Sequence, residues 1–276
     1  MFYTRLRIDC VPSLSEILIA ELSQAGFDTF EETESGLDAF VEEENFDREA
    51  LHEIWIKYGI NKGHYSFQKV KKENWNEQWE KSITPIQIGD QCVIRAEFHS
   101  DQPGTLYNIV ITPKMSFGTG HHATTYLMVK TMLGMNFKDQ QVMDVGCGTS
   151  VLSILAAKMG AEKVEAFDID EWSVINSLEN VERNAVTQVS VKKGVIESLS
   201  FNQPFDIILA NINKNVILSD LHVYASHMKI EGQLLLSGFY EKDIDDIILK
   251  AESFGMAGQK HDSKEDWAVL LLKKIF

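Results

Sequence analysis

One short stretch of sequence constrains the fold more than any other. Val142–Val145 has the composition of a buried strand and runs directly into the glycine-rich turn Gly146–Ser150. The apolar segment Val151–Met159 follows as a helix, which Gly160 ends. A strand, a glycine turn and a helix in succession are typical of nucleotide-binding α/β sheets, because the glycines let the backbone approach the ligand and the helix N-terminus faces it. We therefore predict an α/β domain with a mostly parallel, doubly wound sheet.

Two polar side chains are expected at the same edge of this sheet. The strand Lys163–Phe167 ends at Asp168, about 20 residues beyond the first glycine, where a carboxylate can accept hydrogen bonds from a ribose. The buried strand Phe205–Asn211 ends in an amide, and such sheets bind ligands at the carboxyl ends of their strands. From the local sequence alone, Asn211 could also be the N-cap of the helix that follows.

The residues around the turn indicate which nucleotide binds. Dinucleotide enzymes carry a third glycine where this chain has Val151. Asp144, just before the turn, would repel a pyrophosphate but could accept hydrogen bonds from an ammonium group. The pattern Asp144-x-Gly146-x-Gly148 therefore favours a cofactor with an amino-acid part, a cationic centre and no phosphate, which describes S-adenosylmethionine. A nicotinamide-dependent oxidoreductase shares the sheet and is the alternative from a different class.

A second glycine-containing segment, Ser116–Thr125, leads into a helix. Gly118 and Gly120 permit backbone conformations that are closed to other residues. The adjacent His121 and His122 have no carboxylate or thiol at metal-ligand spacing, so we predict no metal site. The chain has 3 cysteines, which are far apart in sequence, and reduced thiols are expected.

The N-terminal part of the chain predicts a separate small unit. Its strands and apolar-faced helices follow in the order β-α-β-β-α-β, which is that of a ferredoxin-like α+β fold. Residues 1–70 contain no catalytic cluster, so we expect a substrate-recognition domain there. Residues 71–82 lack glycine and proline and carry Trp75 and Trp79 on one helical face, which predicts a linker helix. Residues 83–276 then form the S-adenosylmethionine-binding catalytic domain.

The charge of the chain bears on its partners. Lys and Arg number 26 against 41 Asp and Glu, a net charge of −15, and so acidic a surface repels the phosphates of nucleic acids. Between Asp28 and Glu53, eleven acidic residues are opposed only by Arg48. That segment is either a solvated surface or one that attracts a basic protein. No apolar run approaches the roughly 18 residues of a membrane span, and we expect a cytoplasmic protein.

Together these motifs resemble those of a known family. They are, in chain order, Phe117-Gly118-Thr119-Gly120-x-His122-x-Thr124-Thr125, Asp144-x-Gly146-x-Gly148, Asp168-Ile169-Asp170 and Ala210-Asn211-Ile212. The combination is similar to that of the bacterial methyltransferases of ribosomal large-subunit protein eleven, and the similarity covers essentially the whole chain. It implies a class I methyltransferase domain with a seven-stranded, mostly parallel sheet that binds S-adenosylmethionine. It also implies that the N-terminal domain holds the ribosomal protein.

The resemblance extends to individual residues. By position, the cofactor contacts of the family fall on Thr125, Gly146, Asp168 and Asn211. Methyl groups would go to lysine side chains and the N-terminal amine of a basic ribosomal protein, and Asn211 would position the incoming amine. Five positions depart from the family pattern: Lys114 for glycine, His121 for threonine, Ala123 for proline, Ser150 for a third glycine and Asn213 for an apolar residue.

Methyl transfer to an amine requires a neutral nucleophile. Only about one free lysine in a few thousand is neutral at pH 7, so the enzyme must desolvate or deprotonate the ammonium and hold the reacting atoms in line. We assign no general base, and we expect a monomer without direct nucleic-acid or membrane binding. The nearest alternative is a methyltransferase that acts on another protein, on RNA or on a small molecule.

Overall fold

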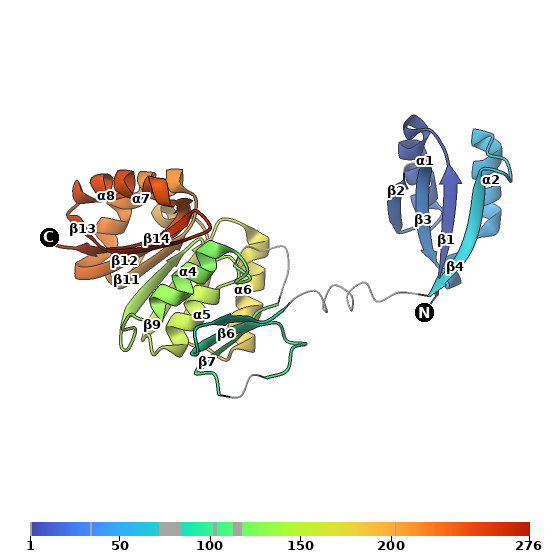
Figure 1. Cartoon of the computed structure of the whole chain (residues 1–276). Coiled ribbons are helices and arrows are strands. Elements are labelled where there is room, and N and C mark those ends of the chain that lie inside the picture. Colours follow the sequence, from blue (N-terminus) through green and yellow to red (C-terminus); the bar gives the residue numbers. More distant parts are fainter. Residues whose placement is uncertain (1, 34, 72–83, 102–103, 113–117, 202) are drawn as a thin grey trace. The chain divides into compact units, whose positions relative to one another are not determined.

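The computed structural model describes residues 2–33, 35–71, 84–101, 104–112, 118–201 and 203–276. The chain divides into two compact units, Met1–Ser82 and Ile83–Phe276 (Figure 1). The predicted linker helix, with Trp75 and Trp79, lies outside the described residues, as does Lys114.

The N-terminal unit is a four-stranded sheet with two helices packed on one face (Figure 1). Its elements are β1 (Phe2–Asp9), α1 (Pro12–Gln24), β2 (Thr29–Thr33), β3 (Gly36–Glu42), the 3-10 helix η1 (Glu43–Asn45), α2 (Arg48–Tyr58) and β4 (Tyr65–Lys71). The strand order is β2-β3-β1-β4 and all neighbouring strands are antiparallel. This order confirms the ferredoxin-like fold predicted from the sequence.

Alternation and capping explain why these residues form these elements. Leu6 and Ile8 of β1 are fully buried, whereas Arg5 and Arg7, which alternate with them, lie on the other face of the sheet. The helix α2 begins after Asp47, whose side chain accepts hydrogen bonds from the backbone N–H groups of its first turn at 2.8 and 3.2 Å. The unit therefore has a hydrophobic core of its own and presents a polar sheet face.

The C-terminal unit is built on a seven-stranded sheet. Its elements are β5 (Ile86–Ile88), β6 (Cys92–Arg95), β7 (Tyr107–Val110), α4 (Ala123–Met132), β8 (Gln141–Val145), α5 (Val151–Lys158), β9 (Lys163–Asp168), α6 (Glu171–Arg183), β10 (Val189–Lys193), η2 (Ile196–Ser198), β11 (Phe205–Asn211), α7 (Lys214–His227), β12 (Met228–Tyr240), η3 (Glu241–Asp243), α8 (Ile244–Glu252), β13 (Met256–Lys264) and β14 (Trp267–Lys274). The strand order is β10-β9-β8-β11-β12-β14-β13, and β14 runs antiparallel to both of its neighbours. This is the predicted doubly wound, mostly parallel sheet.

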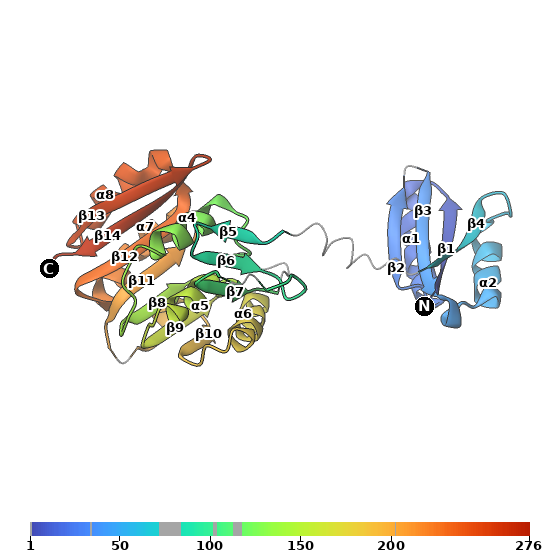
Figure 2. The same ribbon diagram turned by 60° about the horizontal axis from the view of Figure 1, so that its bottom comes forward.

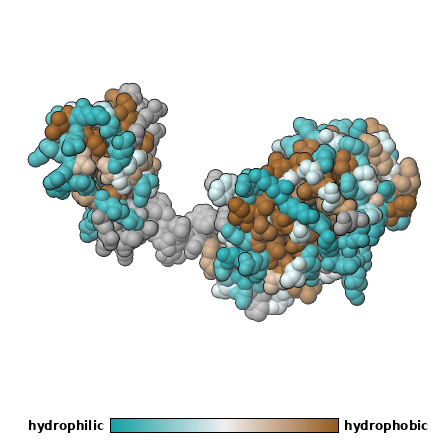
Figure 3. All heavy atoms as spheres, turned by 180° about the vertical axis from the view of Figure 1, so that it is seen from behind, coloured by the Kyte–Doolittle hydropathy of each residue, from teal (hydrophilic) through white to brown (hydrophobic). Residues whose placement is uncertain are grey.

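Both faces of this sheet are hydrophobic, as a parallel sheet between two helical layers requires. Along β8, Val142 packs with α4 and α5, whereas Met143 and Val145 pack with α7 and α8. Figure 2 shows the helices on either side of the strands. On the outside, the face seen in Figure 3 gathers hydrophobic surface in one area of the C-terminal unit, with hydrophilic residues around it. In the described part of the chain, no helix is both long and apolar enough to cross a membrane.

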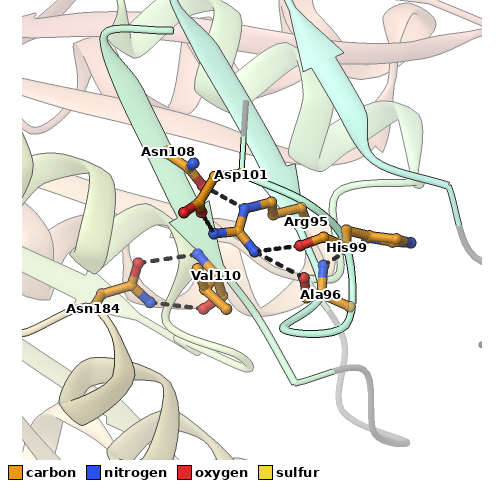
Figure 4. A network of polar contacts seen from close by, with 7 residues as sticks. All are labelled: Arg95, Ala96, His99, Asp101, Asn108, Val110 and Asn184. Atoms are coloured by element: carbon orange, nitrogen blue, oxygen red, sulfur yellow. Dashed lines mark hydrogen bonds and ion pairs between the residues drawn. The ribbon is translucent and has the colours of Figure 1, made fainter. Parts of the chain in front are cut away.

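A three-stranded sheet, β5-β6-β7, precedes the main sheet in sequence and is tied to helix α6. Arg95 at the end of β6 donates to the Asn108 side chain at 3.0 Å and to the backbone carbonyl of His99 at 3.0 Å (Figure 4). Asn184, just beyond α6, accepts from the Val110 N–H at 3.0 Å and donates to the Val110 carbonyl at 2.7 Å (Figure 4). These contacts fix the strand that leads toward the second glycine-containing segment.

Candidate active site

A cavity of about 540 Å³ lies at the carboxyl edge of the seven-stranded sheet. Its lining comes from the ends of β8, β9, β10 and β11 and from flanking segments: His122, Thr124, Val145, Gly146, Gly148, Phe167, Asp168, Ile169, Ser173, Gly194, Val195, Ile196, Asn211, Ile212, Asn213, Val216, Asp220, Gly238 and Trp267. The strand order reverses between β8 and β11, which is where doubly wound sheets bind ligands. Small-molecule sites usually measure about 300–1,000 Å³, so the cavity can hold a nucleoside-sized ligand.

The glycine turn after β8 forms one wall of the cavity. Gly146 and Gly148 have φ angles of 65° and 54°, in the left-handed region that favours glycine. A Cβ atom at Gly146 would lie 2.5 Å from Cγ2 of Ile212, so a larger residue would also collide with the segment after β11. The turn therefore requires glycine for its conformation and for its packing.

Ser150, at the end of the glycine turn, takes the same left-handed conformation with a φ of 61°. Its hydroxyl donates to Oγ of Ser177 at 2.8 Å, and Ser177 donates in turn to the carbonyl of Gly148 at 2.7 Å. Both serines are fully buried. The backbone strain of a non-glycine residue is thus accompanied by hydrogen bonds that hold the turn in place.

Helix α6 supports the turn through further buried polar side chains. Asn180 donates to the carbonyl of Thr149 at 3.0 Å and accepts from the N–H of Thr112 at 2.9 Å. One side chain therefore joins the glycine turn to the segment that follows β7. Cys147, in the turn itself, is buried beside Ser177, and burial raises the pKa of its thiol to about 12, so it is not a nucleophile.

Asp144 does not have the position that the sequence analysis gave it. Its carboxylate is buried and accepts hydrogen bonds from the N–H and the hydroxyl of Ser153, in the first turn of α5. It is not among the residues that line the cavity. The prediction that Asp144 faces an ammonium group is therefore wrong. Asp144 instead fills the helix N-terminus that would otherwise bind a pyrophosphate.

Asp168 lies where the sequence predicts it, at the end of β9 and on the cavity wall. Its Oδ2 accepts from the N–H of Gly148 at 2.9 Å, and its Oδ1 accepts from the N–H of Asp170 at 3.0 Å. A carboxylate offers about four lone-pair positions, so both oxygens can accept further hydrogen bonds from ligand hydroxyls. The backbone contacts hold the carboxylate in one orientation toward the cavity.

Asn211 also lines the cavity, at the end of β11. The N-cap of α7 is Asn213, which accepts from the N–H of Asn215, so the alternative role of Asn211 as an N-cap is wrong. The side-chain oxygen Oδ1 of Asn211 is buried and has no hydrogen-bond donor in the structure. Its Nδ2 lies 3.5 Å from Oγ1 of Thr125, a fully buried residue that does not itself line the cavity.

The second glycine-containing segment reaches the cavity through different residues. His122 and Thr124 line it, and His122 caps helix α4 by accepting from the N–H of Thr124 at 3.3 Å. The carbonyl of Gly118 accepts from Oγ1 of Thr149 at 2.7 Å, which ties this segment to the glycine turn. Among the described residues, no group of three metal-ligating side chains could hold a metal ion.

Sequence reasoning missed several residues of the cavity, and two of them, Trp267 and Asp220, have side chains that bear on its chemistry. Trp267, the first residue of β14, lies 4.8 Å from the ring of His122 and 4.5 Å from that of Tyr240, measured between ring centroids. Asp220 reaches the cavity from helix α7. Neither residue belongs to a local motif, because each is brought to the cavity only by the packing of its element. The sequence offered one indication of Asp220: it is an acidic residue in the helix that directly follows the predicted ligand-binding strand Phe205–Asn211.

The lining fits S-adenosylmethionine better than a dinucleotide. No lysine or arginine occurs among the described residues that line the cavity, and the nearby helix N-terminus already holds Asp144. A diphosphate would therefore find no charge partner. The carboxylates of Asp168 and Asp220 instead favour a cationic, phosphate-free ligand.

Comparison with known proteins agrees with this geometry. The family described as ribosomal protein L11 methyltransferase (PrmA) matches residues 15–275. The chain belongs to this family. The family's relatives include the ribosomal protein L11 methyltransferase of Bacteroides fragilis, which is 40% identical over 264 residues, 95% of this chain and 94% of the relative. That of Porphyromonas gingivalis is 41% identical over 259 residues, 92% and 89% of the two chains.

Solved structures show the same fold. The ribosomal protein L11 methylase of Lactobacillus delbrueckii subsp. bulgaricus superposes with a TM-score of 0.65 at 26% identity, over 70% of this chain and 100% of that one. A methyltransferase of Pyrococcus furiosus has a TM-score of 0.53 at 20% identity, over 61% and 90%, which is a likeness of fold alone.

This member of the PrmA family is thus a methyltransferase that uses S-adenosylmethionine. Its membership decides against the nicotinamide-dependent oxidoreductase. The roles of Thr125, Gly146, Asp168 and Asn211 in binding stay predictions.

Proposed function

We propose that the chain methylates ribosomal protein L11 and that the acceptors are lysine side chains and the N-terminal amine. The family and its relatives carry the name of this substrate. Within the cavity, the observation that most supports an amine acceptor is the buried Oδ1 of Asn211, which has no donor in the structure. A buried acceptor of this kind is costly unless a ligand supplies the missing hydrogen bond.

Three residues would hold the cofactor. Asp168 would accept hydrogen bonds from the ribose hydroxyls, and the glycine turn at Gly146 would admit the amino-acid part close to the backbone. Asn211 lies on the adjacent strand, where it can contact the cofactor and the acceptor. Thr125 would act indirectly, because it reaches the cavity only through Asn211.

The bound cofactor supplies a methyl group on a sulfonium, which an amine can attack only when it is neutral. The role of the protein is to favour the neutral form of the acceptor amine and to hold it in position. The apolar lining, which includes Val145, Ile212 and Trp267, disfavours an ammonium by desolvation. Oδ1 of Asn211 can accept one N–H of the amine and orient its lone pair, so that positioning supplies much of the rate. No general base is assigned.

The acidic N-terminal unit would dock the substrate. Asp38 does not contribute to this surface, because it is buried between Arg5 and Arg7. Other acidic residues between positions 28 and 53 are exposed and make the surface of the unit acidic: Asp28, Glu31, Glu43, Asp47, Glu49 and Glu53. Such a surface favours the approach of a basic protein. In keeping with the net charge of −15, we propose a monomeric cytoplasmic enzyme that does not bind nucleic acid directly.

Mass spectrometry of purified L11 tests this proposal. After incubation with the enzyme and S-adenosylmethionine, methyl groups should appear on lysine side chains and on the N-terminal amine. L11 with an acetylated N-terminus should lose only the terminal modification, because acetylation removes the basic nitrogen. Methylation of other residue types, or none at all, would contradict the proposal.

Removal of residues 1–70 tests the docking role. The truncated enzyme should lose methylation of L11 but keep its affinity for S-adenosylhomocysteine, because the C-terminal unit has its own hydrophobic core and contains the cavity. Calorimetric titration with S-adenosylhomocysteine measures the retained binding. Undiminished methylation by the truncated enzyme would refute a docking role.

A further inference from the structure

The cavity contains a carboxylate that the proposed chemistry does not use. Among the described residues that line the cavity, only Asp168 and Asp220 carry carboxylates. Asp220 is half-buried on α7, where its neighbour Ser219 is one hydrogen-bond partner and the hydroxyl of Tyr224 donates a long hydrogen bond of 3.4 Å. Burial and the nearby charge of Glu197 raise the pKa of Asp220. This carboxylate would therefore be stabilised by a further hydrogen-bond donor.

The residues that line the cavity differ in character on the two sides of Asp168, and each side is called an arm. The strand order β10-β9-β8-β11 places Gly146 and Asn211 on one side of Asp168 and Gly194–Ile196 on the other. The first arm offers backbone and amide groups. The second arm is apolar, and Ile169 adds to it. The arm beside β10 therefore suits the flat, weakly polar faces of a nucleobase.

Asp220 belongs to the apolar arm. Glu197, which follows β10, is close enough to act on it electrostatically. Ile196 packs in the same hydrophobic cluster as Leu221 and Tyr224, the neighbours of Asp220 on α7. The carboxylate thus stands beside the segment after β10, in a region that otherwise offers hydrophobic side chains.

A ribose held at Asp168 would direct the amino-acid part toward the glycine turn and the base toward the apolar arm. Apolar walls stack on any purine but do not distinguish one purine edge from another. We propose that Asp220 is the specificity-determining residue for the base and accepts a hydrogen bond from the exocyclic amino group of adenine. This inference rests on the proposed function of the site, because it assumes that the ribose lies at Asp168.

Calorimetric binding of two ligands tests this role without turnover. S-adenosylhomocysteine carries the amino group, and S-inosylhomocysteine has a carbonyl in its place. The wild-type enzyme should bind the adenosyl ligand at least about tenfold more tightly, because the carboxylate would otherwise face a carbonyl oxygen. In the Asp220→Asn variant the side-chain amide can donate to that carbonyl, so the ratio of the two dissociation constants should fall at least about tenfold.

The control is Asp245→Asn, an exposed aspartate of α8, which should keep the wild-type ratio. Equal affinities in the wild type, or an unchanged ratio in a folded Asp220→Asn variant, would overturn the role of Asp220. A raised KM for L11 with an unchanged ratio would also overturn it and would assign the carboxylate to the acceptor ammonium. If thermal unfolding shows that this variant does not fold, Asp220→Ala is the second variant, in which loss of the acceptor should also lower the ratio at least about tenfold. Failure of the wild type to bind either ligand would instead refute the proposed function.

Discussion

Each unit of the molecule buries one aspartate almost completely, and the two units compensate it differently. Asp38 in β3 and Asp144 in β8 are each 1% exposed. Asp38, in the N-terminal unit, forms ion pairs with Arg5 and Arg7. Asp144, in the C-terminal unit, accepts hydrogen bonds from Ser153 at the start of a helix. One carboxylate is neutralised by two cations, and the other is held by neutral donors.

The two carboxyl groups consequently titrate in opposite directions. Burial by itself raises the pKa of Asp38, but the hydrogen bonds and charges of Arg7 and Arg5 outweigh it, and the pKa lies below its ordinary value. Burial prevails for Asp144 over the hydrogen bonds from Ser153, and Asp168 adds repulsion, so its pKa rises to about 6. The buried charge of the N-terminal unit thus stabilises a scaffold. The buried carboxylate of the C-terminal unit has only neutral hydrogen-bond donors and lies close to a cavity for a cationic ligand. Carboxyl groups with a shifted pKa are frequent at functional sites.

The largest expected effect comes from the carboxylate that faces the cavity. Asp168→Ala should weaken binding of S-adenosylhomocysteine by about 100-fold or more, because each hydrogen bond to a charged group contributes about 1.5–3 kcal/mol. The fold should persist, since water in the cavity can replace the acceptor of the Gly148 and Asp170 N–H groups. Calorimetric titration measures the affinity and thermal unfolding monitors the fold. An unchanged affinity would show that the ribose lies elsewhere.

The second effect concerns the scaffold carboxylate. Asp38→Asn should destabilise the N-terminal unit by about 2 kcal/mol at pH 7, because two arginines lose their charge partner. A lowered folded-state pKa means that the stabilisation is present above the unfolded value of about 3.9 and is lost as the pH falls through the folded value. The difference between variant and wild type should therefore shrink below about pH 4. Hydrogen exchange of the β1 amides measures the stability difference between the variant and the wild type. If this difference did not depend on pH, the ion pairs could not be its cause.

The smallest effect has the opposite sign. Asp144→Asn should stabilise the C-terminal unit by about 1 kcal/mol at pH 8, because it removes a buried charge but keeps an acceptor for Ser153. The raised pKa means that the ionised carboxylate costs stability above about pH 6 and that this cost disappears toward the unfolded value of about 3.9. The gain should thus vanish near pH 4, as hydrogen exchange of the β8 amides would show. A loss of stability at pH 8 would refute the contrast between the two aspartates.

Much of the candidate site could be predicted from local sequence. Asp168 and the glycine turn were found because strand, turn and helix follow one another along the chain. Asp144 was also found, but the direction of its side chain was not, because it depends on how helix α5 packs against β8. Asn211 was ambiguous until the structure showed that Asn213 caps α7. The support from Asn180 was invisible, since its partners lie 31 and 68 residues away in sequence.

The sequence by itself determined the class of sheet, the ferredoxin-like order of the small unit, the cofactor turn and the family. These follow from periodicity and from short contiguous motifs, whose physics acts between neighbours along the chain. Only the tertiary structure decided that Trp267 and Asp220 line the cavity, that Thr125 lies behind it, and that one buried aspartate is paired while the other is not. Those outcomes depend on burial and on partners distant in sequence, and a carboxylate's charge state is set by its surroundings after folding.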